Sequence, residues 1–316
     1  MPDTETVVRP AYRPYAVRVR AVQKLAPHFV RVTFTGPQLE WFGRAGLDQR
    51  IKVVLPLAAE AGSAARFADF GQDSEAGDWY ERWRALPPEE RNPFRTYTVR
   101  RVDAAAREID VDFVVHHGAG PAGAWAERAA VDDELIIIGP DERSPHSRVG
   151  IDWHPGTARR LLLAGDETAA PAICGILESL DPRCEVDAFI EVPTGADTLH
   201  PALPPSSATR LTWIGRDARP HGESLIEAVT AWTDAHRGVL ARAAAPRPQI
   251  LDDIDVDHDL LWDSPEDGDG EFYAWIAGEA GTIKTLRRLL VSGCGVDRKR
   301  VAFMGYWRLG QSERVE

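Results

Sequence analysis

Two short segments carry groups suited to holding a planar ring joined to a diphosphate. The first is Arg95-Thr96-Tyr97-Thr98, which offers a guanidinium, an aromatic ring and hydroxyls within a β-rich stretch. Strand alternation puts Arg95 and Tyr97 on one face and Thr98 on the other, unless the strand ends or bulges there. The alternative is an ordinary strand, in which the arginine forms a surface ion pair and the tyrosine fills a core.

The second segment is glycine-rich and runs His116-His117-Gly118-Ala119-Gly120-Pro121-Ala122-Gly123-Ala124-Trp125. It leads into an apolar helical pattern with Pro121 at the first helical position. A helix start presents unpaired backbone N–H groups and a positive dipole end, which suit a diphosphate. The adjacent histidines do not indicate a metal site, because neighbours in a strand face opposite ways and no third ligand is evident. We therefore expect no metal.

A third segment follows the apolar run at 161–164, which is typical of a buried parallel strand. Its sequence is Gly165-Asp166-Glu167-Thr168-Ala169-Ala170-Pro171. Ligands of open α/β sheets bind at the carboxyl ends of the strands, so this loop is a candidate nucleotide site. No G-x-G-x-x-G fingerprint follows this strand, so a standard dinucleotide site is not supported.

The R-x-Y-T strand, the glycine-rich turn and the G-D-E-T-A-A-P loop together resemble the siderophore-interacting protein family. These proteins are FAD-dependent ferric-siderophore reductases of the ferredoxin-reductase-like superfamily. The likeness extends over nearly the whole chain through Trp275-Ile276-Ala277-Gly278-Glu279-Ala280, Leu286-Arg287-Arg288 and Gly305-Tyr306-Trp307-Arg308-Leu309-Gly310. It implies that electrons pass from NAD(P)H through FAD to a ferric siderophore, and that Fe(II) is released in the cytoplasm.

The resemblance also implies roles for residues of the flavin site. Arg95 would pair with the FAD pyrophosphate through charge-assisted hydrogen bonds. Tyr97 would lie along the flavin or its ribityl chain, and Thr98 would place its hydroxyl near N5, so these two are the expected catalytic residues. Further FAD contacts are expected from Thr96, His116, His117, Gly118, Gly120, Pro121, Ala122 and Trp125, with His117 nearer to the flavin than His116.

For the nicotinamide nucleotide, the resemblance implies contacts from Gly165, Asp166, Glu167, Thr168, Arg216, Gly278 and Glu279. Thr168 or a nearby backbone N–H would meet the diphosphate. Glu191 would bond a ribose hydroxyl and favour NADH, whereas Arg216 would hold a 2′-phosphate and favour NADPH. The sequence leaves this choice open, and an arginine at a strand end is often a surface charge.

The expected substrate site is basic. Ferric siderophores with catecholate or carboxylate groups are negatively charged, so a cation near the flavin would attract them. Lys52 is the best positional match to the basic residues of the family, with Arg50, Arg308 and Trp307 as further candidates. Each cation could instead be a surface charge, and Trp307 could pack in a core. Arg287 and Arg288 are expected on a solvated helix face.

Two domains are predicted from the order of strands and helices. Six short strands with turn signals predict a closed antiparallel β-barrel, the FAD-binding domain, over residues 1–154. Strands that alternate with helices then predict a doubly wound parallel sheet, the NAD(P)H-binding α/β domain, over residues 155–316. The expected strands are 16–22, 29–34, 51–55, 94–102, 108–115, 134–138, 161–164, 185–192, 210–215, 272–277 and 300–304. An acidic insertion is expected at about 238–271.

The composition of the chain bears on its cellular location and its binding partners. The chain has 316 residues, 44% of them hydrophobic and 27% charged, which is typical of soluble globular proteins. The net charge of −12 argues against nucleic acid or an anionic membrane as a partner. The first 15 residues do not read as a signal peptide, and Cys174, Cys184 and Cys294 form no iron–sulfur or disulfide pattern. We therefore expect a cytoplasmic monomer without stable membrane association.

Two other functions fit parts of this pattern. A general NAD(P)H-dependent flavin or ferredoxin-type oxidoreductase would share both cofactor sites, but not the basic pocket or the C-terminal motifs. A non-catalytic siderophore-binding iron chaperone would use the barrel only as a scaffold. Bound flavin that NAD(P)H bleaches would argue against the chaperone.

Overall fold

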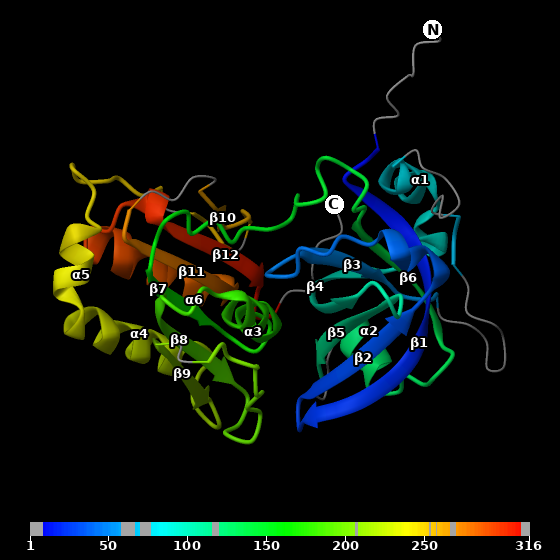
Figure 1. The fold of residues 1–316 in the computed structure, drawn as a ribbon, viewed down its shortest axis with the longest axis horizontal. Helices are drawn as coiled ribbons and strands as arrows, with labels where there is room; N and C mark the ends of the chain where they lie inside the picture. The colour runs from blue at the N-terminus through cyan, green and yellow to red at the C-terminus, as the bar shows by residue number, and fades with distance from the viewer. Residues whose placement is uncertain are drawn as a thin grey trace, which may run out of the picture. The chain divides into compact units, whose positions relative to one another are not determined.

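The computed structural model describes residues 9–57, 67–69, 77–115, 120–205, 208–252, 254–256, 258–265 and 270–310. The chain divides into two compact units, residues 1–25 with 29–151 and residues 26–28 with 152–316. Figure 1 shows the barrel strands in the first unit and a second sheet with its helices in the other.

The first unit is a closed barrel of antiparallel strands in the order β1-β2-β5-β4-β3-β6. Alternate side chains of these strands point inward, so that Val32, Val111 and Ile137 are fully buried in its core. The prediction of a six-stranded antiparallel barrel is confirmed. The strands are β1 (Tyr12–Ala26), β2 (Phe29–Thr35), β3 (Arg50–Val54), β4 (Phe94–Asp103), β5 (Glu108–Val114) and β6 (Glu134–Pro140).

The short helices α1 and α2 pack on this barrel. Helix α1 (Trp79–Ala85) buries Trp83 in an apolar cluster that includes Phe94. Helix α2 (Pro121–Ala126) places the ring of Trp125 at centroid distances of 6.2 Å from Phe34 and 5.6 Å from Phe113. The unit also contains the 3₁₀ turns η1 (Pro37–Trp41) and η2 (Pro88–Glu90).

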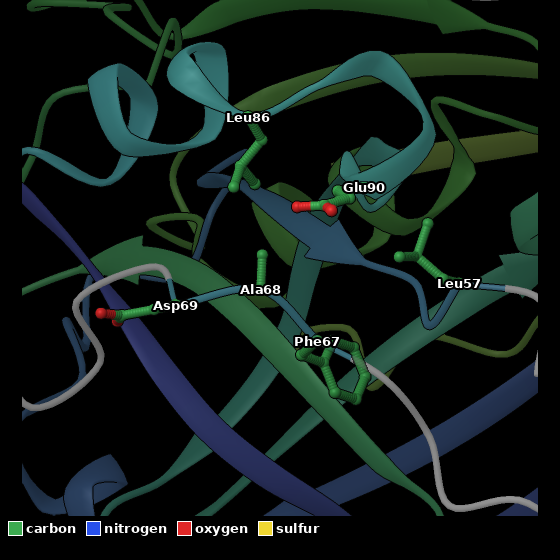
Figure 2. A pocket seen from close by; sticks show the side chains of 6 residues that line it. All are labelled: Leu57, Phe67, Ala68, Asp69, Leu86 and Glu90. Atoms are coloured by element: carbon green, nitrogen blue, oxygen red, sulfur yellow. The ribbon is translucent and has the colours of Figure 1, made fainter.

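A hollow of about 210 Å³ lies beside α1 (Figure 2). The charged side chains that line it in the described part of the chain, Asp69 and Glu90, are both acidic, which disfavours an anionic ligand. None of its lining residues belongs to the predicted sites, and we assign it no ligand. The lining residues are Leu57, Phe67, Ala68, Asp69, Leu86 and Glu90.

The second unit contains a sheet in the order β10-β12-β11-β7-β8-β9. The five strands β7, β8, β9, β11 and β12 pair in parallel, as predicted, and the apolar run at 161–164 is fully buried. The sequence did not predict β10, which pairs antiparallel with β12 and comes from the acidic insertion. The strands are β7 (Arg160–Gly165), β8 (Glu185–Val192), β9 (Ala208–Gly215), β10 (Trp262–Asp263), β11 (Phe272–Glu279) and β12 (Val301–Trp307).

Arg287, the last residue of a helix in this unit, is buried. Arg287 is 5% exposed and donates hydrogen bonds to the Asp252 carbonyl and to the Asp263 carboxylate. The prediction of a solvated face is therefore wrong for Arg287, because the acidic insertion covers that side of its helix, and right for the exposed Arg288. The helices are α3 (Ala170–Ser179), α4 (Glu223–Ala235), α5 (Arg237–Arg242) and α6 (Ala280–Arg287), followed by a π turn (Arg288–Gly293) and a 3₁₀ turn (Arg298–Arg300).

Among the described residues, no helix has both the length and the apolar character that a membrane span requires.

Candidate functional site

The strand β4 carries the Arg95-Thr96-Tyr97-Thr98 segment and pairs antiparallel with β3. Lys52 lies opposite Thr96, and Arg50 lies opposite Thr98. Residues directly opposite each other in an antiparallel pair share a face, so these four side chains lie on one side of the barrel wall. Lys52 Nζ donates a 2.7 Å hydrogen bond to Thr96 Oγ1. Two predicted substrate-binding cations therefore lie beside two predicted FAD-contacting hydroxyls.

Arg95 and Tyr97 belong to the alternate set of β4 residues, as strand alternation predicts. The Tyr97 ring packs against the barrel core with its centroid 4.5 Å from that of Phe113, which fixes the ring orientation. Arg95 is half-buried, and its Nη1 donates a 2.7 Å hydrogen bond to the carbonyl of Phe94. An oriented ring and a half-buried guanidinium on one strand face suit a flavin joined to a pyrophosphate.

The glycine-rich segment is described only from Gly120 onward, so the predicted contacts of His116, His117 and Gly118 lie outside the described residues. Pro121 opens α2 and Gly120 precedes it, as predicted. Among the described residues, a Cβ placed on Gly120 would meet no atom within 4 Å. The side chains of Ala122 and Trp125 are buried in the barrel core and anchor α2. Their contact with FAD stays a prediction.

The second group of polar residues is centred on Asp166, which is 1% exposed. Its Oδ1 accepts hydrogen bonds from the Thr168 N–H at 2.9 Å and the Thr168 hydroxyl at 2.5 Å. Its Oδ2 accepts from the Glu279 N–H and from the indole N–H of Trp307, both at 2.8 Å. One carboxylate thus joins the loop after β7 to the ends of β11 and β12.

Two predicted site glycines are required by this packing. Gly278 has φ +149°, and a Cβ there would lie 2.6 Å from Oδ2 of Asp166. A Cβ on Gly165 would lie 2.6 Å from the carbonyl oxygen of Ala277 on β11. Both distances are shorter than side chains tolerate, so the strand ends approach this closely only with glycine at these positions.

Arg216 lies between two carboxylates. Its Nη2 and Nη1 donate to Oε1 and Oε2 of Glu167 at 3.0 and 3.1 Å, and its Nη1 also donates to Oε1 of Glu191 at 3.2 Å. Glu191 is fully buried and accepts from the N–H groups of Gly222 and Leu225 at 2.8 and 3.1 Å, at the start of α4. The expectation that Glu191 meets a ribose hydroxyl is wrong, because its carboxylate is occupied and inaccessible.

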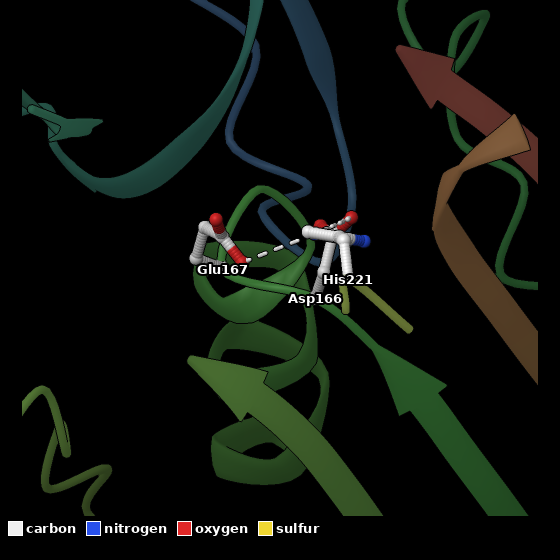
Figure 3. Close-up of side chains that lie close together, drawn as sticks. All are labelled: Asp166, Glu167 and His221. Carbon is white, nitrogen blue, oxygen red and sulfur yellow. Dashed lines mark ion pairs between the residues drawn. The ribbon is translucent and has the colours of Figure 1, made fainter. Parts of the chain in front are cut away.

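His221 completes the group and was missed by the sequence reasoning. Its Nε2 lies 3.7 Å from Oδ2 of Asp166 and 3.7 Å from Oε2 of Glu167 (Figure 3). The ring meets the Trp307 ring edge-on, with centroids 4.9 Å apart. No motif marks His221. The available signal was its place shortly after β9, where loops from neighbouring parallel strands converge.

Burial and neighbouring charges shift the pKa values of this group. Burial, followed by the charge of Glu167, raises the pKa of Asp166 to about 6. Burial also acts to raise the pKa of Glu167, but His221 and Arg216 outweigh it and lower the pKa to about 2. Burial lowers the pKa of His221, yet the two carboxylates outweigh it and raise the pKa above the ordinary 6.5.

Asp166, Glu167 and His221 are also metal-binding residue types, with ligand atoms within 4.8 Å of one another. The oxygens of Asp166 already accept four hydrogen bonds, and Arg216 donates to both oxygens of Glu167. A divalent cation would compete with these donors and with the charge of the guanidinium. We therefore assign the group to holding the strand ends together.

Glu279 and Arg308, two further predicted site residues, form hydrogen bonds within the second unit. The Glu279 carboxylate accepts a 2.8 Å hydrogen bond from the Thr282 N–H and caps α6. Arg308 donates to the carbonyl of Asp259. The residues predicted to contact the nucleotide are therefore brought together, but many of their polar groups bind one another. Substrate contacts by Trp307 and Arg308 stay predictions.

A closed antiparallel barrel followed by a mixed sheet with helices is the ferredoxin-reductase-like fold. A solved ferredoxin reductase of carbazole 1,9a-dioxygenase shares this fold with a TM-score of 0.58, at 14% identity over 94% of this chain and 71% of that chain.

The chain belongs to the siderophore-interacting protein family. The siderophore-interacting FAD-binding domain matches residues 8–144, and the siderophore-interacting protein domain matches residues 158–310. An uncharacterized protein of Mycobacterium bovis is 33% identical, with 95% of this chain and 92% of the relative covered. The ferric vibriobactin reductase ViuB of Vibrio cholerae is 28% identical, with 95% and 90% covered. A siderophore utilization protein from T. fusca has a TM-score of 0.67 and 26% identity, with 96% of each chain covered.

Proposed function

We propose that this protein is an NAD(P)H-dependent ferric-siderophore reductase that uses FAD and releases Fe(II) in the cytoplasm. One NAD(P)H supplies two electrons, so it reduces two Fe(III) to two Fe(II) and yields NAD(P)⁺ and a proton. When bound, FAD supplies the conversion between a two-electron donor and a one-electron acceptor. The FAD-binding family match and the similarity to a ferric vibriobactin reductase support this proposal.

The residues of β4 bind and orient the cofactor. The Arg95 guanidinium offers charged N–H donors to the pyrophosphate, and the Tyr97 ring, held by Phe113, offers a fixed face for the flavin. No atom of the described residues lies within 4 Å of a Cβ placed on Gly120, which would let a phosphate approach the backbone there. These groups position the cofactor, and none has to gain or lose a proton.

The observation that carries the proposal is the register of β3 on β4. Lys52 and Arg50 lie directly opposite Thr96 and Thr98, so positive charge is placed beside two of the predicted FAD contacts, on the face of β4 opposite that of Arg95 and Tyr97. A ferric catecholate or carboxylate siderophore is anionic, and such cations attract it toward the flavin. The siderophore itself ligates the iron, so the protein needs no iron ligands, and Fe(II) binds hard oxygen ligands less tightly than Fe(III).

An anaerobic absorbance titration tests the proposal. The purified protein should carry or take up FAD, NAD(P)H should bleach it, and a ferric siderophore should restore the yellow colour while a colorimetric Fe(II) chelator develops its signal. Recovery with ferredoxin or dyes but not with ferric siderophores would instead indicate a general oxidoreductase. Siderophore binding without any flavin would indicate an iron chaperone.

A further inference from the structure

Residues of the second unit indicate which nicotinamide nucleotide is the electron donor. This inference rests on the proposed function. We propose that the donor is NADH rather than NADPH, because the arginines that follow β9 are already held by carboxylates and the surrounding charge is negative. The two nucleotides differ only in a 2′-phosphate. Their comparison therefore isolates how the protein treats that one group.

Arg216 is the first cation after β9, at the carboxyl end of the sheet where nucleotides bind in open α/β folds. Its guanidinium makes three hydrogen bonds to two carboxylates, and its side chain is only 16% exposed. A 2′-phosphate needs charged donors that can turn toward it. Arg216 could serve only after leaving Glu167 and Glu191, which would leave two buried carboxylates without their cation.

Glu191 also opposes the release of Arg216 from its carboxylate partners. It lies near the end of β8, where the acidic residue of dinucleotide-binding folds often bonds the ribose. Here it is fully buried and holds the first turn of α4 through Gly222 and Leu225 while it accepts from Arg216. The same carboxylate thus joins the start of the helix to the guanidinium. Arg216 is fixed to the scaffold and not presented to a ligand.

Arg219, the other arginine between β9 and α4, is also engaged. Its Nη2 and Nη1 donate to the two oxygens of Glu227 at 2.7 and 2.9 Å, and Glu223 lies 3.4 Å from Nη2. This pair is more exposed than that of Arg216, so it is easier to open. Even so, both arginines of this loop are matched by acidic partners.

The charge near Arg216 adds to this effect. Three carboxylates, from Asp166, Glu167 and Glu191, are grouped with one guanidinium and the imidazole of His221. A 2′-phosphate would bring up to two further negative charges into this surplus, at a site with little water to screen them. NADH brings a neutral hydroxyl to the same place.

The test uses the full-length FAD-loaded protein and two readouts. Stopped-flow absorbance measures flavin bleaching by NADH and by NADPH without oxygen. Calorimetry compares 5′-AMP with adenosine 2′,5′-bisphosphate, which differ only in the 2′-phosphate, so binding is read independently of the reaction. We expect selectivity of about tenfold or more for the unphosphorylated partner in both, declining as salt screens the charges.

The variant Glu167→Gln removes one carboxylate and loosens Arg216, so the preference for NADH should narrow several-fold through a lower KM for NADPH. Its matched control is Glu185→Gln, the same change at an exposed residue at the opposite end of the parallel strands, where selectivity should not change. Equal use of both nucleotides, or a preference for NADPH, overturns the inference and leaves the proposed function standing. If neither nucleotide bleaches the flavin and neither adenosine ligand binds, the NADH inference and the proposed function are both overturned.

Discussion

The indole N–H of Trp307 donates a 2.8 Å hydrogen bond to Oδ2 of Asp166, across 141 residues of sequence. The same oxygen accepts from the backbone of Glu279, so a single buried carboxylate fixes the ends of three parallel strands. The loop after β7 is therefore positioned by partners on β11 and β12 as well as by its own turn. This relationship makes Asp166 a structural centre of the predicted nucleotide site.

Asp166→Asn should destabilise the second unit. An amide presents N–H groups where two N–H donors now point at an oxygen, and at least one buried donor loses its acceptor. The expected loss is about 1–3 kcal/mol in the free energy of unfolding. Urea unfolding measures it, and hydrogen exchange at residues 279–282 locates it. Asp181→Asn, at a partly exposed residue paired with Arg183, is the control and should change neither readout. Unchanged protection at 279–282 would contradict the role of Asp166.

Gly278→Ala should be costly for two reasons at once. The backbone has φ +149°, which residues with a Cβ rarely adopt, and the new methyl group would meet the carboxylate of Asp166 at 2.6 Å. We expect a loss of about 2 kcal/mol or more. Gly195→Ala is the matched control, since a Cβ there meets no atom of the described residues within 4 Å. Equal melting temperatures of the two variants would refute the close approach.

The elements predicted best from the sequence are those with a regular period. Strand alternation correctly placed Arg95 and Tyr97 on one face of β4, and the apolar run at 161–164 correctly predicted a buried parallel strand. The strand β10 was missed because two residues in an aspartate-rich segment show no period. Arg287 was misjudged because its burial depends on chain that returns from elsewhere in the sequence.

In the candidate site, too, the sequence predicts which residues come together but not how each of them is paired. The convergence of strand ends correctly grouped Asp166, Arg216 and Glu279. Which donor each carboxylate accepts depends on tertiary packing, so the sequence could not show that Glu191 is occupied by α4 or that Trp307 reaches Asp166.

Arg95→Ala should weaken FAD binding. Losing the charge-assisted hydrogen bonds to the pyrophosphate should raise the Kd for FAD by about tenfold to a hundredfold. The flavin-to-protein absorbance ratio after purification and a fluorescence titration of the apoprotein measure the change. Arg101→Ala is the control, because Arg101 lies on the same strand but is half-exposed and paired with Asp110. If the Arg95 variant purifies with full flavin, Arg95 does not hold the pyrophosphate.

Lys52→Gln should raise the KM for anionic ferric siderophores several-fold, because it removes attraction and leaves the barrel wall intact. Flavin bleaching by NAD(P)H should stay at the wild-type rate. The effect should shrink with added salt and be absent for a neutral ferric trihydroxamate. Lys24→Gln, at an exposed residue of β1, is the control for general surface charge. A KM equal to that of the wild type for the anionic chelates would remove Lys52 from the substrate site.

His221 should make the stability of the second unit depend on pH. Burial opposes its charged form, but Glu167 and Asp166 outweigh burial and raise its pKa in the folded state above 6.5. A raised histidine pKa gives stability that is fully present below about pH 6.5 and is lost as the pH rises through the folded pKa. The pKa of Asp166 is raised to about 6, so its contribution to stability is also lost as the pH rises, but mostly at lower pH. The pKa of Glu167 is lowered to about 2, so this residue changes the stability only in acid.

The difference in melting temperature between the wild type and His221→Gln should therefore be larger at about pH 6 than at about pH 9. The matched variant His200→Gln, at an exposed histidine of the same unit, should show no such trend. A difference that stays constant or grows toward alkaline pH would mean that His221 is neutral in the folded protein and that its two carboxylate neighbours do not hold a proton on the ring.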